Sequence, residues 1–266
     1  MTISIEIVIV MAILGTCFGG MLAFANKKFK IEVNPLIHIV EDILPKGQCG
    51  ACGYPGCMAY AEAVVTDPNV SPNLCIPGKD PVAKAVAELT GKKAESIAPH
   101  VARVMCRGME QVARVRYRYY GVPDCVEENV LFGGSKACKY GCLGLGSCVR
   151  ACPFDAIEIG DDGLPVVDEF KCTACGKCQN ICPKKVIALI PTDSKTFNHC
   201  ASKYKGQDVK KICTVGCIGC GICAKQCQHG AIEMVHNLPV IDHTKCSVCK
   251  ERLCATKCPT KSMGSL

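Results

Sequence analysis

The 266-residue chain contains no tryptophan, and aromatic residues make up only 5% of it. Large aromatic side chains provide much of the buried area of an ordinary hydrophobic core. Because this chain has so few of them, some other element must organise its fold. Cysteine is the candidate, since the chain contains 25 cysteines.

The sequence also lacks the short motifs that mark common enzymes. It has no glycine-rich dinucleotide-binding fingerprint, no Walker loop and no Ser–His–Asp pattern with supporting context. Its six histidines are scattered, which favours structural or solvent-exposed roles. We therefore expect no catalytic residue and no hydride chemistry in this chain by itself.

Long apolar runs are rare too, and the one that is present lies at the amino terminus. Residues 3–25 carry Glu6 as their only charge, and a bilayer-spanning helix needs about 20 apolar residues. A secretion signal has basic residues before its apolar run, whereas Lys27, Lys28 and Lys30 follow this one. The run predicts a membrane anchor, with the rest of the chain in the cytoplasm by the positive-inside rule. A buried core helix is the alternative.

A cytoplasmic location argues against disulfides and for metal ligation by cysteine. Twenty of the cysteines fall into five groups of four at short spacings. Glycine crowds the first group, where it permits tight turns and lets backbone N–H groups approach inorganic sulfide. We expect this group to bind an iron–sulfur cluster. It comprises Cys49, Cys52, Cys57 and Cys75.

Two cysteine runs in the middle of the chain form one unit. The second run has the spacing C-x2-C-x2-C-x3-C-P of bacterial two-cluster ferredoxins, and the first run is spaced more loosely. In those ferredoxins the fourth cysteine of each run binds the cluster of the other run. We therefore expect one cluster on Cys138, Cys142, Cys148 and Cys182 and its neighbour on Cys172, Cys175, Cys178 and Cys152.

The last part of the chain repeats this unit. In both copies the fourth cysteine of the first run precedes a strand, a tight turn and a strand, with Ala-Ile-Glu and Leu-Pro-Val segments at matching places. This similarity indicates an internal duplication. Gln228 replaces the usual proline, which removes no ligand. The same rule places one cluster on Cys217, Cys220, Cys223 and Cys258 and another on Cys246, Cys249, Cys254 and Cys227.

Zinc is the alternative occupant of closely spaced cysteines. Zinc sites use two pairs, whereas the ferredoxin runs contain triplets, so zinc stays open mainly for the first group. Five cysteines lie outside the groups; we expect a small apolar role for the one in the membrane run and buried structural thiols for the other four. A sixth cluster on those four is the alternative. The five are Cys17, Cys106, Cys125, Cys200 and Cys213.

The formal charge of +7 is weak evidence for nucleic-acid binding, because it counts every cysteine as neutral. A four-iron cluster with its four thiolates carries a charge of about −2, so five clusters would bring the total to about −3. We expect no nucleic-acid partner. A segment rich in arginine either docks an acidic electron carrier or forms a solvated basic face. Its arginines are Arg103, Arg107, Arg114, Arg116 and Arg118.

The order of these features resembles one known family. A membrane run is followed by Gly-Gln-Cys-Gly-Ala-Cys-Gly-Tyr-Pro-Gly-Cys at residues 47–57 and then by ferredoxin-type runs. The segment at residues 133–148 is also similar to that family. Over essentially its whole length the chain resembles the B subunit of the Rnf complex, the ion-translocating ferredoxin:NAD+ oxidoreductase, in its longer version with a duplicated ferredoxin part.

These observations predict an α+β fold with small helices at residues 35–44 and 80–89. The domains expected are a transmembrane anchor (1–26), a 4Fe-4S domain (27–95), a connecting segment (96–130), and two tandem two-cluster ferredoxin-like modules (131–192 and 193–266).

The resemblance implies a membrane-anchored electron-transfer subunit with five 4Fe-4S clusters. It implies soluble ferredoxin as the electron donor and, as partners, other membrane subunits that include a flavin- and NAD-binding one. It also implies coupling to Na+ or H+ transport, and a single-pass location in the cytoplasmic membrane of a prokaryote with the clusters on the cytoplasmic side. The alternatives are an electron-transfer subunit of another anaerobic dehydrogenase or hydrogenase and, less favoured, a zinc-binding scaffold.

Overall fold

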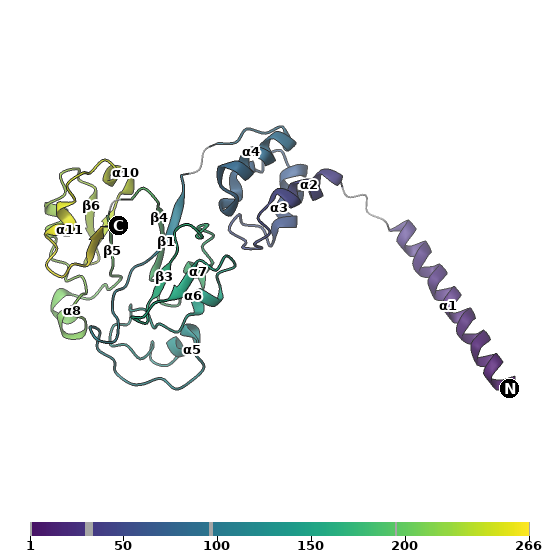
Figure 1. Cartoon of the computed structure of the whole chain (residues 1–266), viewed down its shortest axis with the longest axis horizontal. Coiled ribbons are helices and arrows are strands. Elements are labelled where there is room, and N and C mark those ends of the chain that lie inside the picture. Colours follow the sequence, from purple (N-terminus) through teal and green to yellow (C-terminus); the bar gives the residue numbers. More distant parts are fainter. Residues whose placement is uncertain (1, 30–33, 96–97, 195, 266) are drawn as a thin grey trace.

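The computed structural model describes residues 2–29, 34–95, 98–194 and 196–265. Lys30 of the lysine cluster lies outside these residues. The described chain forms a long amino-terminal helix, a small helical domain, and a larger body of short helices and two-stranded sheets (Figure 1). The mixed helix and strand composition expected from the sequence is confirmed.

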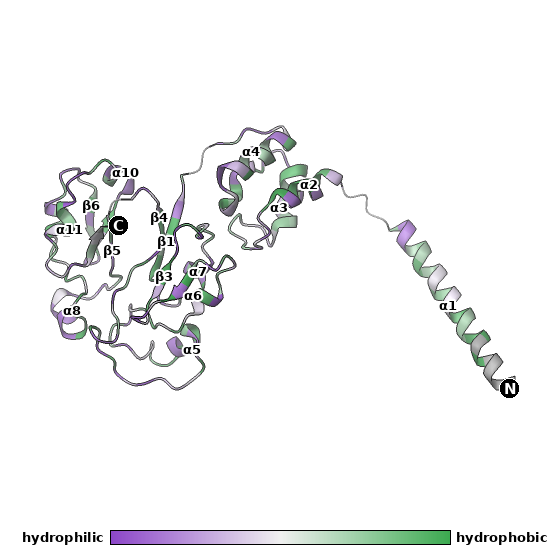
Figure 2. Cartoon of the chain, in the orientation of Figure 1, coloured by the Kyte–Doolittle hydropathy of each residue, from purple (hydrophilic) through white to green (hydrophobic). Residues whose placement is uncertain are grey.

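The apolar run at the amino terminus forms helix α1 (Thr2–Lys28). Its stretch Ile9–Lys28 has a mean hydropathy of 1.8, and none of that stretch is buried in the molecule. Figure 2 shows an apolar helix that stands apart from the rest of the chain. Helix α1 is therefore not a core helix of this chain, and its length and composition suit a membrane span.

The small domain consists of three helices around one apolar core. The apolar periodicity of residues 35–44 forms α2, and the Asn34 side chain caps it by accepting a hydrogen bond from the Leu36 N–H. The helix expected at residues 80–89 is present as α4, so both helix predictions are confirmed. The bounds are Pro35–Ile43 for α2, Cys57–Thr66 for α3, Lys79–Thr90 for α4, and Pro72–Leu74 and Ile76–Gly78 for the 3-10 turns η1 and η2.

The first part of the larger body contains a strand ladder and a hairpin. In the ladder, β1 and β4 run antiparallel from His100 opposite Pro191 to Val104 opposite Ile187. Because β1 lies within residues 96–130, part of the expected connecting segment belongs to the larger body. The bounds are His100–Val104 for β1, Cys125–Val130 for α5, Ser147–Arg150 for α6, Ile157–Ile159 for β2, Pro165–Val167 for β3, Lys177–Ile181 for α7 and Ile187–Pro191 for β4.

The second part of the body repeats this arrangement. Its ladder pairs β5 with β8, from Thr196 opposite Ser265 to Asn198 opposite Met263, and its hairpin pairs β6 with β7. The strand–turn–strand predictions for the two repeats are thus confirmed by the β2–β3 and β6–β7 hairpins. The bounds are Thr196–Asn198 for β5, Gly206–Ile212 for α8, Ile222–Lys225 for α9, Ile232–Val235 for β6, Leu238–Ile241 for β7, His243–Cys246 for α10, Leu253–Thr256 for α11 and Met263–Ser265 for β8.

Candidate metal centres

The cysteines that follow α1 gather in six groups of four, which we number 1 to 6. Three of these groups each line one cavity in the larger body, and in each the fourth cysteine of one run lies with the first three of the other run. The cavities contain about 300 Å³ of empty space at groups 2 and 5 and about 410 Å³ at group 6, part of it open to solvent. The members are Cys152, Cys172, Cys175 and Cys178 in group 2, Cys217, Cys220, Cys223 and Cys258 in group 5, and Cys227, Cys246, Cys249 and Cys254 in group 6.

Group 1 lies on the small domain, in the loop before α3 and at the turn after η1. Gly50 and Gly53 in this loop have φ angles of +71° and +88°, which residues with a side chain rarely adopt. Burial raises the pKa of Cys75 to about 11, and the charges of the other three thiols add to the rise. The four thiols are therefore close neighbours. They are Cys49, Cys52, Cys57 and Cys75.

The first ferredoxin-type run is arranged differently from the sequence expectation. Cys138 lies in the wall of another cavity, and Cys125 lies beside Cys142 and Cys148 instead. Burial raises the pKa of Cys142 to about 12 and that of Cys148 to about 11. The charge of Cys125 contributes to both rises, and at Cys142 the charge of Cys106 contributes more. Cys182 also contributes to the rise at Cys148. Group 3 thus contains Cys125, Cys142, Cys148 and Cys182.

The internal repeat contains the signal that identifies Cys125. The run from Cys142 to Cys148 has the same length as the run from Cys217 to Cys223. When the two runs are aligned, the middle cysteine of the later run corresponds to Leu145, which cannot bind metal. The earlier run is therefore one ligand short, and Cys125 at the start of α5 supplies a thiol in its neighbourhood.

Hydrogen bonds fix Cys125 against the helix that carries Cys148. The Cys125 N–H donates to Ser147 Oγ over 2.7 Å, and Ser147 Oγ donates to Asp124 over 2.9 Å. Arg150 forms a 2.7 Å ion pair with Asp124 and, as the largest cause, lowers the pKa of that carboxyl. These contacts join the start of α5 to α6, so the position of Cys125 is set by side chains and not by a free loop.

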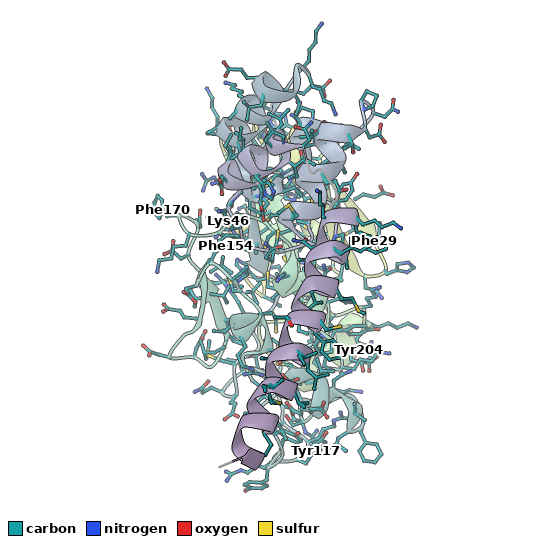
Figure 3. All side chains as sticks on the ribbon, turned by 90° about the vertical axis from the view of Figure 1, so that its right-hand side faces the viewer. Phe29, Lys46, Tyr117, Phe154, Phe170 and Tyr204 are labelled. Carbon is teal, nitrogen blue, oxygen red and sulfur yellow. The ribbon has the colours of Figure 1, made fainter. Side chains whose placement is uncertain are left out.

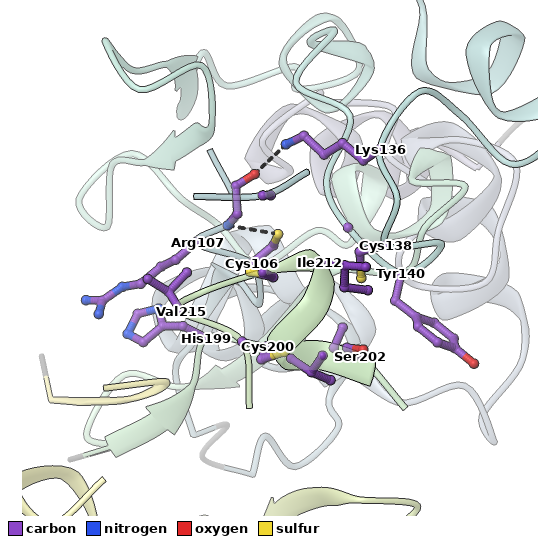
Figure 4. Close-up of a pocket in the computed structure, with 17 residues that line it drawn as sticks. Cys106, Arg107, Lys136, Cys138, Tyr140, His199, Cys200, Ser202, Ile212 and Val215 are labelled. Carbon is purple, nitrogen blue, oxygen red and sulfur yellow. Dashed lines mark hydrogen bonds between the residues drawn. The ribbon is translucent and has the colours of Figure 1, made fainter. Parts of the chain in front are cut away.

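Group 4 consists mostly of thiols that lie outside the five groups expected from the sequence. They line a cavity of about 440 Å³ between the two halves of the larger body (Figure 4). Three of them were expected to be buried structural thiols, and one was expected in the first ferredoxin-type run. The members are Cys106, Cys138, Cys200 and Cys213.

Backbone amides donate hydrogen bonds to cysteine sulfurs at matching positions of the repeat. The Ala156 N–H lies 3.4 Å from Cys152 Sγ, and the Ala231 N–H lies 3.3 Å from Cys227 Sγ. Such bonds stabilise negative charge on a metal-bound sulfur and help to set the potential of a cluster. They suit thiolate ligands of a redox centre better than inert thiols.

Burial changes the acidity of the thiols before any metal binds. It raises the pKa of Cys178 to about 12 and that of Cys223 to about 11. These thiols are therefore protonated at neutral pH without metal, and metal binding must release their protons. In the part of the chain that the structure describes, no three metal-binding side chains converge closely enough to hold a single ion. The cysteines surround volumes, as ligands of a cluster do.

The arginine-rich segment is partly engaged within the molecule. Arg103 is mostly buried and forms a 2.5 Å ion pair with Glu169. Arg107 and Arg116 donate hydrogen bonds to backbone carbonyl oxygens. Four of the five arginines remain exposed, so the docking of an acidic carrier by this segment stays a prediction.

Two family profiles match the chain in the regions that carry these groups. A family described as an Fe-S cluster matches residues 44–77, which include all of group 1. A family described as a 4Fe-4S dicluster domain matches residues 136–186. Both profiles fit iron–sulfur clusters as the occupants of the cysteine groups within the matched residues.

Full-length relatives are known from several organisms. The B subunit of the proton-translocating ferredoxin:NAD(+) oxidoreductase complex of Clostridium ljungdahlii is 53% identical over 266 residues, which is 100% of this chain and 94% of the relative. The B subunit of the Na(+)-translocating complex of Acetobacterium woodii is 43% identical over 250 residues, or 94% and 74% of the two chains. The B subunit of the ion-translocating oxidoreductase complex of Methanosarcina acetivorans is 42% identical over 262 residues, or 98% of each.

A membrane-type helix joined to 4Fe-4S domains and buried cysteine groups defines a membrane-associated iron–sulfur electron-transfer protein. The relatives then give the family. The chain belongs to the family of B subunits of the Rnf-type ion-translocating ferredoxin:NAD+ oxidoreductase complexes, and it is an iron–sulfur electron-transfer subunit of such an enzyme. The resemblance found in the sequence is confirmed, and the alternatives of another dehydrogenase or a zinc scaffold are set aside.

Proposed function

We propose that this chain takes electrons one at a time from reduced soluble ferredoxin and relays them to other membrane subunits of its complex. A flavin- and NAD-binding subunit then reduces NAD+, and the energy released moves Na+ or H+ across the membrane. The names of the relatives support this proposal, since one is called proton-translocating and another Na(+)-translocating. The chain itself contributes the electron path and no catalytic residue.

The anchor gives the proposed orientation of the protein. Lys27 and Lys28 lie in the last turn of α1, and basic residues flank membrane helices on the cytoplasmic side. The amino terminus then lies outside, and everything after α1 lies in the cytoplasm of a prokaryote. Soluble ferredoxin is a cytoplasmic protein in this arrangement, so donor and clusters share one compartment.

Five 4Fe-4S clusters occupy groups 1, 2, 3, 5 and 6 in this proposal. Each group supplies the four thiolates that such a cluster needs. Groups 2 and 3 belong to one ferredoxin-like module, which extends into the expected connecting segment to include Cys125, and groups 5 and 6 belong to another. In group 3 the fourth ligand is Cys125 in place of Cys138, because Cys125 is the thiol that lies beside Cys142 and Cys148.

The proximity of neighbouring groups is the observation that carries the proposal. Burial raises the pKa of Cys175, and the charge of Cys49 on the small domain adds to this rise, so groups 1 and 2 are close. Burial also raises the pKa of Cys178 to about 12, with a contribution from Cys148, so group 2 is close to group 3. Electrons can therefore pass between these groups in single steps.

Phe154 lies at the junction between the small domain and the larger body (Figure 3). A Cβ atom added to Gly47 would lie only 2.7 Å from the Phe154 ring, and Phe154 also lines the cavity of group 2. The loop before group 1 therefore packs directly against the wall of group 2. This contact keeps the two centres close while the small domain stays tethered to the membrane.

Anaerobic stopped-flow mixing tests the proposal. Reduced soluble ferredoxin is mixed with the oxidised full-length chain in detergent, and the visible absorption of both proteins is followed. We expect ferredoxin to be oxidised while the clusters of the chain bleach. Cys17→Ser, which changes a thiol in α1 only, is the matched control and should react at the same rate. A chain with full iron content that ferredoxin does not reduce contradicts the proposed donor.

A further inference from the structure

The cavity of group 4 has the same construction as the cavities of the ferredoxin-type groups. Its volume of about 440 Å³ compares with about 410 Å³ at group 6, and four cysteines line each of them. The four thiols come from separate segments of the chain, so no local spacing motif connects them. They are Cys106, Cys138, Cys200 and Cys213.

Backbone contacts bring these segments to one place. Cys106 and Cys200 face each other in an isolated antiparallel bridge, and a second bridge joins Ala113 to Cys213. A Cβ atom added to Gly108 would lie 3.5 Å from Cys106 Sγ and 3.9 Å from Cys213 Sγ. Two of the sulfurs therefore face the same small volume. Gly108 has no side chain that would fill it.

Positive charge surrounds this volume. The N–H groups of Gly108 and Cys142 each donate to Cys106 Sγ over 3.4 Å. Lys136 lines the cavity with only 6% of its surface exposed, and its ammonium donates to the Gly108 carbonyl over 2.5 Å (Figure 4). Within the described residues no carboxylate forms an ion pair with Lys136. A buried ammonium of this kind is costly unless an anion lies nearby, and a cluster with four thiolates is such an anion.

The position of group 4 connects the two ferredoxin-like modules. On one side, the N–H of Cys142 in group 3 touches the sulfur of Cys106. On the other side, the backbone N–H of Cys217 in group 5 lies within hydrogen-bond reach of the Cys200 sulfur. Group 4 is thus next to group 3 and next to group 5. A redox centre there would adjoin a cluster of each module.

We infer that Cys106, Cys138, Cys200 and Cys213 bind a sixth 4Fe-4S cluster that carries electrons between the two ferredoxin-like modules. This inference rests on the proposed function, because it needs the clusters of groups 3 and 5 as neighbours. In each step the cluster is reduced by one electron as one neighbour is oxidised, and it is reoxidised as the other neighbour is reduced. No proton or covalent bond is transferred. The six groups then form one continuous path from group 1 to group 6.

Iron and acid-labile sulfide contents per chain test this inference. The full-length chain is purified anaerobically in detergent and treated with ferrous iron and sulfide until its iron content stops rising. Six four-iron clusters predict about 24 iron and about 24 sulfide per chain, whereas five predict about 20. Cys213→Ala should lower each content by about 4, and Cys106→Ala should do the same. Cys17→Ala is the matched control and should leave both contents unchanged.

A variant in group 5 separates failure of this inference from failure of the proposed function. Cys220→Ala removes a ligand of an expected cluster and should lower the iron content by about 4. About 20 iron in the unsubstituted chain, about 20 in Cys213→Ala and about 16 in Cys220→Ala would overturn the sixth cluster and leave the five-cluster path intact. Very little iron in the unsubstituted chain would overturn both. If the group 4 variants do not fold, the count of 24 or 20 in the unsubstituted chain decides alone.

Discussion

The two ferredoxin-like repeats of this chain agree in their hairpins and in the hydrogen bonds that support them. In the first repeat, the Asp168 N–H donates to the Ala156 carbonyl over 2.8 Å, and the Asp242 N–H makes the same bond to Ala231 in the second. The amide-to-sulfur bonds at Cys152 and Cys227 also match. These shared contacts surround the crossed fourth cysteine, so the duplication preserved the geometry that joins one run to the other.

The repeats differ where the first run begins. The second repeat has a cysteine in the middle of its run, whereas the first has Leu145 and a thiol contributed by α5. Cys138, which the spacing placed at the start of the first run, lies in group 4 instead. This difference indicates that a cysteine in an irregularly spaced run can belong to a different group from its neighbours in the sequence. Four predictions test how far the two repeats are equivalent.

Removal of iron should separate the two repeats most strongly. The first repeat keeps an apolar core that includes Val101, Val186 and Ile190, whereas among the described residues the buried cluster of the second repeat is smaller and contains Ile232 and Met263 beside two cysteines. Small metal-stapled folds lose structure without their metal. After a chelator has removed the iron, backbone amide hydrogens of β6 should exchange with solvent about 100-fold faster than those of β1. That ratio corresponds to about 2.7 kcal/mol, the contribution of one or two buried apolar side chains.

Hydrogen exchange followed by mass spectrometry measures this difference, with the iron-loaded chain as the control. In the loaded chain both strands should be protected. Equal exchange in β1 and β6 after iron removal would show that the apolar core of the first repeat does not support it independently of its clusters.

Double substitutions should reveal the crossed ligands in the first repeat. Cys148 and Cys182 belong to one group, so Cys148→Ala with Cys182→Ala should lose about 4 iron, no more than either single variant. Cys178 belongs to the neighbouring group, so Cys178→Ala with Cys182→Ala should lose about 8. The same test with Cys125→Ala and Cys148→Ala should lose about 4. Cys125→Ala alone should also lose about 4 iron, and no loss from that single variant would return Cys138 to group 3.

The second repeat provides the control for these pairs. Cys223→Ala with Cys258→Ala should lose about 4 iron, and Cys254→Ala with Cys258→Ala should lose about 8. If the iron losses of the two repeats show opposite patterns, the fourth cysteine binds the cluster of the other run in one module only.

Local patterns predicted much of this fold because the elements concerned are local. The apolar run of α1, the helical periodicity of α2 and the strand–turn–strand hairpins each lie within one short segment. The partner of β1 could not be predicted this way, because β4 lies far along the chain. The same holds for group 4, whose thiols come from four segments joined only by tertiary contacts. Leu145 stands where the second repeat has a cysteine, which indicates that another thiol must replace it. This signal is visible only when the two repeats are aligned.

A glycine at equivalent positions of the two repeats should differ in its tolerance of alanine. Gly144 has a φ of +81°, and a Cβ atom there would lie 2.6 Å from the Gly163 carbonyl oxygen. Gly219 has a φ of +64°, and its Cβ would lie 3.1 Å from the Asn237 carbonyl oxygen. Gly144→Ala should cost about 3 kcal/mol of unfolding free energy and Gly219→Ala about 1 kcal/mol, because the first forces the opposing backbone to move farther. Anaerobic urea unfolding of the iron-loaded chain measures both, and equal costs would contradict the tighter fit of the first repeat.

The smallest effect should come from two aspartates that precede the later run of each repeat. Asp168 accepts hydrogen bonds from the N–H groups of Phe170 and Lys171, as Asp242 does from those of Thr244 and Lys245. Both side chains are about two-fifths exposed, so alanine at either place should lower the thermal unfolding midpoint by about 2–4 °C, a typical loss for one capping interaction. Asparagine keeps the accepting oxygen and should restore most of the loss in both repeats. The two aspartates accept matching backbone bonds at the same exposure, and Asp242 also accepts a hydrogen bond from the Thr244 hydroxyl. A larger shift for Asp168→Ala than for Asp242→Ala would therefore show that the later runs are supported unequally.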